Sequence, residues 1–466
     1  MKSAEADLIE NRTFDEIAIG DRASLTRKVT RENIELFAVI SGDVNPAHLD
    51  PDYAKGDLFH RVIAHGMLGA GLISAVLGTV LPGPGAIYLG QDLTFLRPVG
   101  IGDEITATVT VTEKVEASGE LVLACVCRNQ EGKEVITGLA RVRAPREKVK
   151  RPRVELPEVR ISRHERLHAL LAAAAGGETM TVAVAHPCDA TSIEGAVEAA
   201  EAGLIRPVFV GPLAKIAKAA EAAGLDISAY EQVDAPHSDA AAAAAVALIR
   251  AGKADLLMKG SLHTDELLHA VLDEEKGLRT KRRLSHVYLM DVPRHPKPLL
   301  ITDAAVNIAP NLREKRDIIQ NAIDLAHVMG TAKPKVAILS AVEVVNPAIP
   351  STLDAAALCK MADRGQITGA LVDGPLAFDN AVSLKAAKDK GIVSEVAGDA
   401  DILVVPDLEA GNMLAKQLTF LAGADAAGVV LGARVPIILT SRADSKETRL
   451  ASCAVAALMA RARLGA

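Results

Sequence analysis

Residues 104–112 read EITATVTVT, a stretch in which apolar residues alternate strictly with threonines. Successive side chains of a β-strand point to opposite faces of the sheet, so this pattern predicts a strand with one buried and one exposed face. The runs from Leu121 to Cys127 and from Val135 to Val142 continue the pattern. Because antiparallel sheets commonly leave one face in water, we expect these strands to form an antiparallel sheet.

Two helices are expected ahead of this sheet. The first should begin after Thr30, a residue type that caps helices, and should carry an apolar side formed by Ile34, Phe37, Ala38 and Ile40. The second begins at Gly66 and should end after roughly four turns at the run Pro82–Gly85. It is too short for a membrane span, which needs about 20 apolar residues. Helices followed by an antiparallel sheet indicate an α+β domain over residues 1–145.

The remainder of the chain has a different pattern. Residues 146–163 are rich in charge and proline and are expected to form a solvated linker. From residue 164 to 466, short apolar runs alternate with alanine-rich helical segments, including a surface helix through residues 240–245. The runs are TVAVA at 181, PVFVG at 207, ADLLM at 254, KVAILS at 335, GALVDG at 369, DILVVP at 401, GVVLG at 428 and VPIILT at 435. This alternation predicts an α/β domain with a mostly parallel sheet, which binds ligands at the carboxyl ends of its strands.

Composition excludes several classes of function. The 466 residues carry a net charge of -7, contain no tryptophan and are only 2% aromatic, so neither a polyanion-binding surface nor base-stacking platforms are expected. The five cysteines are scattered without a Cys-x-x-Cys pair, which is typical of a reduced, cytoplasmic protein. The first residues lack the basic start and apolar run of a signal peptide. We therefore expect a soluble cytoplasmic protein that binds neither nucleic acid nor membrane.

The first candidate site lies in residues 41–48, SGDVNPAH, where Asp43 and His48 flank an Asn-Pro turn. A carboxylate beside an imidazole can hold one water molecule and manage its proton near neutral pH. A little further on, Gly66 begins the apolar helix, and free N–H groups at a helix start can stabilise a developing oxyanion. By spacing alone, a purely structural turn at Asp43 remains an alternative.

A resemblance adds to this pattern. SGDVNPAHLDPDYA, HRVIAHGMLGAGLIS and LTFLRPVGIGDEITATVTV, within residues 15 to 145, resemble the MaoC-like (R)-specific enoyl-CoA hydratases, which have a hot-dog fold. The resemblance implies that Asp43 and His48 hold the catalytic water, that Asn45 supports them, and that the Gly66 N–H binds the thioester oxygen. It also implies reversible syn hydration of a trans-2-enoyl-CoA to an (R)-3-hydroxyacyl-CoA. A dehydratase or thioesterase on the same fold is the alternative.

The second candidate site lies near the C-terminus, where polar residues follow apolar runs at 404–412 and 440–444. Arg442 suits phosphate because its planar guanidinium forms paired, charge-assisted hydrogen bonds, and the Ser441 hydroxyl can donate to an oxyanion. The alternative is a helix start capped by Ser441 or Asp444.

This half also resembles a known family. LLMKGSLHTDELL, GLRTKRRLSHV, LLITDAAVNIAP, VDGPLAFDNA, AGDADILVVPDLEAGN and PIILTSRADS resemble the phosphate acetyl/butyryltransferases, closest to the butyryl branch. The resemblance implies a two-lobed domain, like that of isocitrate and isopropylmalate dehydrogenases, that transfers an acyl group between CoA and phosphate without a metal. Arg442 would bind phosphate or CoA, and Ser441 would assist the tetrahedral intermediate. Asp303 and Lys259 are further candidates for the cleft.

One departure from the family leaves an alternative open. In acetyl-specific members, an aspartate six residues after the arginine acts as a base toward the thiol. This chain has Thr448 at that position. A C-terminal domain that senses acyl-CoA without catalysis is therefore a second hypothesis. We expect a bifunctional acyl-CoA enzyme that needs no metal or cofactor, takes acyl-CoA and phosphate as substrates, and forms a homo-oligomer. A His-Glu-x-x-His match at residues 164–168 has no third ligand nearby and does not predict a zinc site.

Overall fold

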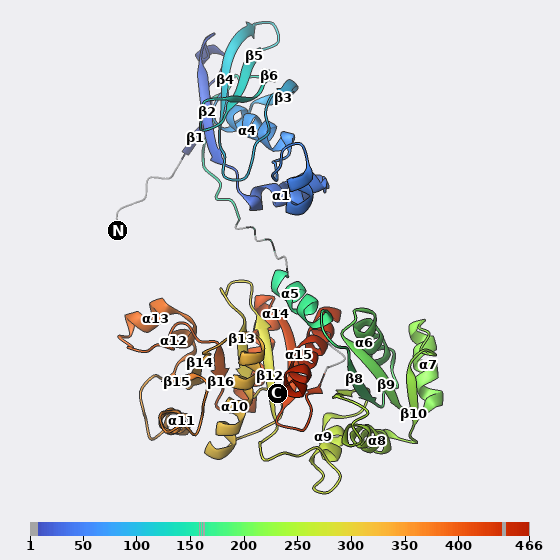
Figure 1. Cartoon of the computed structure of the whole chain (residues 1–466). Coiled ribbons are helices and arrows are strands. Elements are labelled where there is room, and N and C mark those ends of the chain that lie inside the picture. The colour runs from blue at the N-terminus through green and yellow to red at the C-terminus, as the bar shows by residue number, and fades with distance from the viewer. Residues whose placement is uncertain (1–7, 158, 160, 162–163, 440–443, 466) are drawn as a thin grey trace. The chain divides into compact units, whose positions relative to one another are not determined.

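The computed structural model describes residues 8–157, 159, 161, 164–439 and 444–465. The chain divides into two compact units, residues 1–162 and 163–466, which are described separately below. Figure 1 shows a small unit with a curved sheet around one helix, and a larger α/β unit.

The first unit is built on a five-stranded antiparallel sheet with the strand order β2-β4-β5-β6-β3. Its strands are β2 (Arg22–Lys28), β3 (Ile87–Phe95), β4 (Glu104–Val115), β5 (Glu120–Arg128) and β6 (Glu134–Arg143). In β4 the apolar residues of the alternating stretch are buried, whereas the threonines are partly or fully exposed. The predicted strand with one buried face is confirmed.

The helices of this unit are α1 (Arg31–Ser41), α2 (Pro46–Leu49), α3 (Pro51–Gly56), α4 (Gly66–Thr79) and the 3₁₀ turn Phe14–Glu16. Helix α4 lies across the sheet and buries Ile73, Val76 and Leu77 against it (Figure 1). A long apolar helix held by an antiparallel sheet is the hot-dog arrangement, so the fold expected for this half is confirmed.

Two details of the prediction for this unit are wrong. Thr30 does cap α1, by accepting a hydrogen bond from the Asn33 N–H, but Ile40 is 83% exposed. It lies two residues beyond the buried Ala38, about 200° around the helix, and so faces away from the core. Strand β2 precedes the helices and was not predicted. Its only apolar residues are Ala23 and Leu25 among charged and hydroxyl side chains, as is common for an edge strand.

Part of the predicted linker belongs to this first unit. β7 (Lys150–Pro152) pairs antiparallel with β1 (Leu8–Glu10). Just before β7, the Asn11 side chain donates to the Glu147 carbonyl and accepts from the Val149 N–H. These bonds hold residues 147–152 against the N-terminal segment. The stretch is exposed to solvent, as expected for the predicted linker, but over residues 147–152 its backbone is paired with the N-terminal segment.

The second unit contains an eleven-stranded sheet with the order β10-β9-β8-β11-β18-β17-β12-β13-β16-β14-β15. All eight apolar runs found in the sequence are strands: β8 (Met180–Ala185), β9 (Ile205–Gly211), β11 (Leu256–Lys259), β14 (Lys335–Leu339), β15 (Leu371–Leu376), β16 (Ile402–Val404), β17 (Asp425–Leu431) and β18 (Ile437–Ile438). Three further strands were not predicted: β10 (Glu231–Asp234), β12 (Ser285–Asp291) and β13 (Leu299–Thr302).

The direction of the strands reverses in the middle of this sheet. Strands β10, β9, β8, β11 and β18 are mutually parallel, and so are β13, β16, β14 and β15. Between these two blocks, β17 and β12 make only antiparallel pairs. The sheet is thus mostly parallel, as predicted, but its two blocks run in opposite directions, so their carboxyl ends lie at opposite edges.

Helices cover this sheet (Figure 1). They are α5 (Glu165–Ala175), α6 (Ala190–Glu201), α7 (Leu213–Ala223), α8 (Ser238–Arg250), α9 (Thr264–Leu272), α10 (Leu312–Val328), α11 (Pro350–Asp363), α12 (Phe378–Val382), α13 (Leu384–Asp389), α14 (Leu408–Ala422) and α15 (Lys446–Leu464). The alanine run lies in α8, where Ala241, Ala242 and Ala245 are fully buried. Ala243 and Ala247 on the other face of the helix are exposed, so the predicted surface helix is confirmed. None of the described helices is both long and apolar enough to cross a membrane.

Candidate functional site

Asp43 lies in a tight loop that joins two helices of the hot-dog unit. Helix α1 ends at Ser41 and is followed by Gly42, whose φ of 74° is in the left-handed region that glycine adopts without strain. The Asp43 carboxylate accepts a hydrogen bond from the Asn45 N–H at 3.2 Å, and the Asn45 side chain accepts one from the Ala47 N–H at 3.1 Å. Asn45 therefore caps α2, the short helix that carries His48. Through these two bonds Asn45 links the Asp43 carboxylate to the start of the helix that carries His48.

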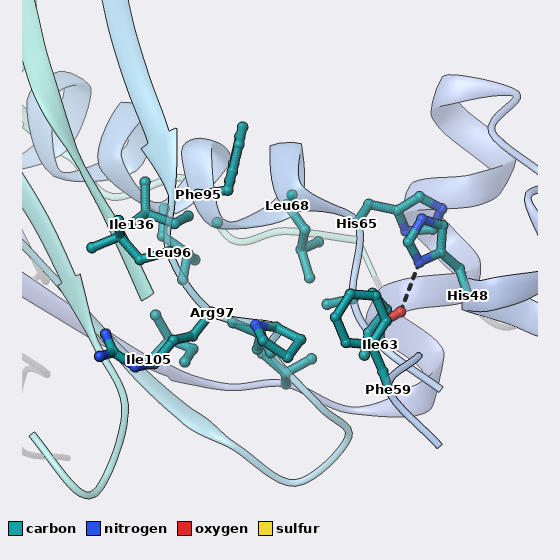
Figure 2. A pocket seen from close by; sticks show the side chains of 17 residues that line it. His48, Phe59, Ile63, His65, Leu68, Phe95, Leu96, Arg97, Ile105 and Ile136 are labelled. Carbon is teal, nitrogen blue, oxygen red and sulfur yellow. Dashed lines mark hydrogen bonds between the residues drawn. The ribbon is translucent and has the colours of Figure 1, made fainter. Parts of the chain in front are cut away.

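The orientation of His48 is fixed by the backbone. Its Nδ1 lies 2.8 Å from the carbonyl oxygen of Ile63 (Figure 2). A carbonyl only accepts hydrogen bonds, so Nδ1 carries the proton and Nε2 keeps its lone pair. This tautomer leaves Nε2 able to accept a hydrogen bond from water. One potential ligand atom from each of Asp43, His48 and His65 lies within 4.8 Å of the other two, so the structure brings the predicted carboxylate and imidazole together.

Gly66 is the first residue of α4, so its N–H has no acceptor within the helix. It lines the same cavity as His48. A methyl group placed on Gly66 would lie 2.9 Å from the ring of Phe95, closer than real contacts allow. Glycine at this position keeps the helix start open to an approaching oxygen atom.

The cavity has a volume of about 350 Å³ and is mostly apolar. In Figure 2 the imidazoles of His48 and His65 lie at one end, and the walls are formed by Phe59, Ile63, Leu68, Phe95, Leu96, Ile105 and Ile136. An apolar chamber with polar imidazole groups at one end suits a substrate with a hydrocarbon chain and one reactive end.

His65 is a site residue to which neither the motif nor the resemblance assigned a role. It is 3% exposed, and its ring stacks on that of His48 with centroids 3.9 Å apart and planes tilted by 38°. The signal that could have found it is its position directly before Gly66. The lone pair of an imidazole nitrogen lies in the plane of the ring. The lone pairs of two stacked rings therefore do not converge on one point, as they would have to do to bind the same cation. This geometry favours holding water over a cation shared by His48 and His65.

Replacing Gly66 with alanine should impair the cavity without unfolding the unit. The added methyl group displaces Phe95 and crowds the helix start, so we expect kcat/KM for hydration to fall about 10- to 100-fold. The matched control is Gly71→Ala in the same helix, where an added methyl group meets no atom within 4 Å. That variant should keep full activity and gain about 0.5–1 kcal/mol of stability. Steady-state hydration rates and thermal unfolding check both expectations, and equal activities in the two variants would refute the role of Gly66.

Of the residues predicted for the acyltransferase site, Ser441 and Arg442 lie outside the described residues. Lys259 is the last residue of β11, and β11 pairs directly with β18, the strand that precedes them in the chain. Asp303 follows β13, whose direction is opposite to that of β11. The carboxyl ends of β11 and β13 therefore lie at opposite edges of the sheet, and the structure does not place Asp303 beside Lys259.

Asp303 itself is 3% exposed and accepts hydrogen bonds from the backbone N–H groups of Ala305, Val306 and Asn307. The Asn307 side chain donates to the same carboxylate. A buried carboxylate that accepts four hydrogen bonds from its own loop stabilises the conformation of that loop. Contact between Asp303 and substrate remains a prediction.

The start of α15 corrects the alternative proposed for this region. Its cap is Ser445, which accepts a hydrogen bond from the Thr448 N–H at 3.2 Å, and not Ser441 or Asp444. The Arg449 side chain donates to the Asp444 carbonyl and forms an ion pair with Glu198 on α6. The turn that follows residue 443 is therefore anchored to a neighbouring helix.

A second cavity, of about 730 Å³, lies in the α/β unit. Its lining includes five cationic side chains, Arg279, Lys281, Arg282, Arg283 and Arg313. Two carboxylates, Glu314 and Asp317, also line it, so the lining carries an excess of positive charge. Arginine and lysine are the side chains that bind phosphate groups.

Two kinds of chemistry find no support among the described residues. His164 lies outside α5 in a left-handed conformation and is 2.5 Å from Asp425, so the His-Glu-x-x-His match does not put two imidazoles on one helical face. Burial raises the pKa of Cys127, Cys359 and Cys453 to about 12. These three thiols are therefore not nucleophiles near neutral pH.

Comparison with known proteins matches both halves. A family model described as "MaoC like domain" matches residues 17–125, and one described as "Phosphate acetyl/butaryl transferase" matches residues 235–457. The phosphate acetyltransferase of Rhizobium meliloti is 65% identical over 305 residues, which is 66% of this chain and 96% of that protein. The chain belongs to the phosphate acetyl/butyryltransferase family.

The relatives of the C-terminal half include both acetyl and butyryl enzymes. The phosphate butyryltransferase of Clostridium acetobutylicum is 45% identical over 283 residues, 61% of this chain and 94% of that protein. The expected closeness to the butyryl branch stays a prediction. A branched-chain phosphotransacylase from Enterococcus faecalis V583 is 33% identical, with a TM-score of 0.55 over 60% of this chain and 99% of that one.

For the hot-dog half, the R-hydratase PhaJ1 from Pseudomonas aeruginosa is 43% identical. The match covers 34% of this chain and 100% of that one, with a TM-score of 0.33.

Proposed function

We propose that the chain is a bifunctional acyl-CoA enzyme with two separate sites. The first hydrates trans-2-enoyl-CoA reversibly to (R)-3-hydroxyacyl-CoA, and the second transfers a short acyl group between CoA and phosphate. The observation that carries the first proposal is the proximity of Asp43 to His48, whose side chain lines an apolar cavity that Gly66 also lines. Membership of the acyltransferase family supports the second.

Hydration follows from the arrangement of three groups. Asp43 and Nε2 of His48 hold a water molecule by accepting its hydrogens, and Nε2 takes a proton as the water oxygen bonds to the β-carbon of the enoyl thioester. Negative charge then moves to the thioester oxygen, where the Gly66 N–H and the positive end of α4 stabilise it. The proton returns from His48 to the α-carbon on the same face, which gives syn addition.

Acyl transfer requires an attack of phosphate on the thioester carbonyl. Arg442 binds phosphate or CoA, and the Ser441 hydroxyl donates to the oxyanion of the tetrahedral intermediate. The intermediate collapses by releasing the CoA thiolate, which takes up a proton, and leaves acyl phosphate. The cation-lined cavity supports a role for this unit in binding phosphate groups.

We further propose that neither reaction needs a metal or a cofactor and that the protein acts in the cytoplasm as a homo-oligomer. The likeness of the α/β unit to isocitrate and isopropylmalate dehydrogenases likewise stays a prediction. Dialysis against EDTA should leave both rates unchanged if no metal takes part.

The hydratase assignment is tested with crotonyl-CoA. Hydration removes the conjugated absorbance without releasing thiol, whereas a thioesterase releases thiol, and a dehydratase that cannot be run in reverse leaves crotonyl-CoA intact. We also propose that one pool of short acyl groups, near C4, meets both sites. Rates of both reactions over a series of acyl-CoA lengths test this idea, and two non-overlapping preferences would contradict it.

A further inference from the structure

His65 combines three features that the proposed mechanism does not use. Its side chain is enclosed, with the ring between His48, at 3.9 Å, and Phe37, at 4.9 Å. Its Nε2 lies 3.0 Å from the backbone carbonyl oxygen of Asp43. Its Nδ1 is buried and has no hydrogen-bond partner among the described residues.

The contact with Asp43 fixes the tautomer of His65. A carbonyl oxygen only accepts, so Nε2 carries the proton and donates, and Nδ1 keeps its lone pair. At the N-terminus of a helix, such a lone pair can accept a hydrogen bond from a free backbone N–H. His237 does so at the start of α8, where it accepts from the Ala240 N–H at 3.3 Å. At the start of α4 the His65 side chain makes no capping bond, so its ring is directed to the Asp43 loop instead of its own helix.

We infer that His65 is a positioning residue for hydration, which sets the distance between the water-binding carboxylate and the oxyanion donor. His65 directly precedes Gly66, and its Nε2 holds the backbone of Asp43. One imidazole thus joins the loop that orients the water to the helix start that binds the thioester oxygen. Both groups act on one substrate, and a misplacement of about 1 Å costs about 10²-fold in rate.

This inference rests on the proposed hydratase function. Three variants distinguish the contribution of Nε2 from that of Nδ1. His65→Gln places an amide N–H near the position of Nε2 and can still donate to Asp43. His65→Asn reaches only the position of Nδ1, and His65→Phe keeps the ring but neither nitrogen. The Phe variant loses the hydrogen bond from Nε2 to the Asp43 carbonyl, which destabilises the fold. It also removes Nδ1, a buried acceptor without a partner in the described part of the chain, which stabilises the fold. Because the two effects oppose each other, we expect little change in stability.

The test measures kcat and KM for crotonyl-CoA hydration across pH. The Phe and Asn variants should lose about 10²-fold in kcat at every pH, with KM close to that of the wild type, because His65 exchanges no proton. The Gln variant should recover most of the rate. Phosphate-dependent CoA release by the same preparations should be unchanged, which controls for protein concentration and for folding of the α/β unit.

Three results would overturn the inference: wild-type kcat in the Phe variant, recovery by Asn but not by Gln, or equal losses in all three variants with a lowered unfolding temperature of the hot-dog unit. A wild-type protein that fails to hydrate crotonyl-CoA would instead contradict the proposed function, so the two failures are distinguishable.

Discussion

Asp43→Asn should lower kcat for crotonyl-CoA hydration by about 10²-fold, the cost in rate of misplacing a reacting group. The amide oxygen of asparagine can still accept from the Asn45 N–H, as the carboxylate does at 3.2 Å. The loop should therefore keep its conformation while losing the negative charge that orients the water. A continuous assay of the conjugated absorbance measures the effect.

The control for Asp43→Asn is Asp52→Asn, which makes the same chemical change nine residues further along. The Asp52 side chain is 88% exposed and pairs with Lys55 on the same short helix, so this variant should hydrate crotonyl-CoA at the wild-type rate. An Asp43→Asn variant as active as Asp52→Asn would mean that the loop is structural and that the water is held elsewhere.

Arg442→Ala should lower phosphate-dependent release of CoA from butyryl-CoA by about 10²–10³-fold, because the variant loses the charge-assisted hydrogen bonds with which Arg442 is proposed to bind phosphate or CoA. Arg442→Lys should recover only part of the loss, because lysine keeps the charge but not the planar, two-pronged geometry that phosphate prefers. Thiol release in the presence and absence of phosphate measures both effects.

Hydration of crotonyl-CoA by the Arg442 variants is the internal control and should be unchanged. Phosphate-dependent release that survives in Arg442→Ala would exclude the role assigned to this residue. A wild-type protein that binds butyryl-CoA but never releases CoA to phosphate would favour the sensing domain considered from the sequence.

The sequence predicted those parts of the fold in which apolar residues recur with a clear period. The threonine-alternating stretch became β4, and each apolar run of the second half became a strand, because burial on one or both faces leaves a clear pattern in the residues. Strand β2 was missed, because an edge strand with only Ala23 and Leu25 on its apolar side has almost no pattern to read. The reversal of strand direction at β12 and β17 could not be predicted, since a strand of either direction has the same period.

The candidate site was predictable in so far as it rests on local chemistry. Asp43, Asn45 and His48 lie in one turn, and their spacing and resemblance placed them together. His65 was missed because its role depends on contacts across the fold, with the carbonyl of Asp43 and the ring of His48. In the same way, the resemblance suggested Asp303 as a cleft residue. The four hydrogen bonds that its carboxylate accepts within its own loop are visible only in the folded structure.

The most direct test of the central claim, two independent acyl-CoA sites in one chain, is to measure both reactions on one purified preparation. The wild-type protein should remove the absorbance of crotonyl-CoA without thiol release and should release CoA from butyryl-CoA only when phosphate is present. In the double variant Asp43→Asn, Arg442→Ala both rates should fall, each by the factor of its own single variant, because two sites that share no residues act independently. A wild-type protein that lacks either activity, or a single substitution that abolishes both, would contradict the account.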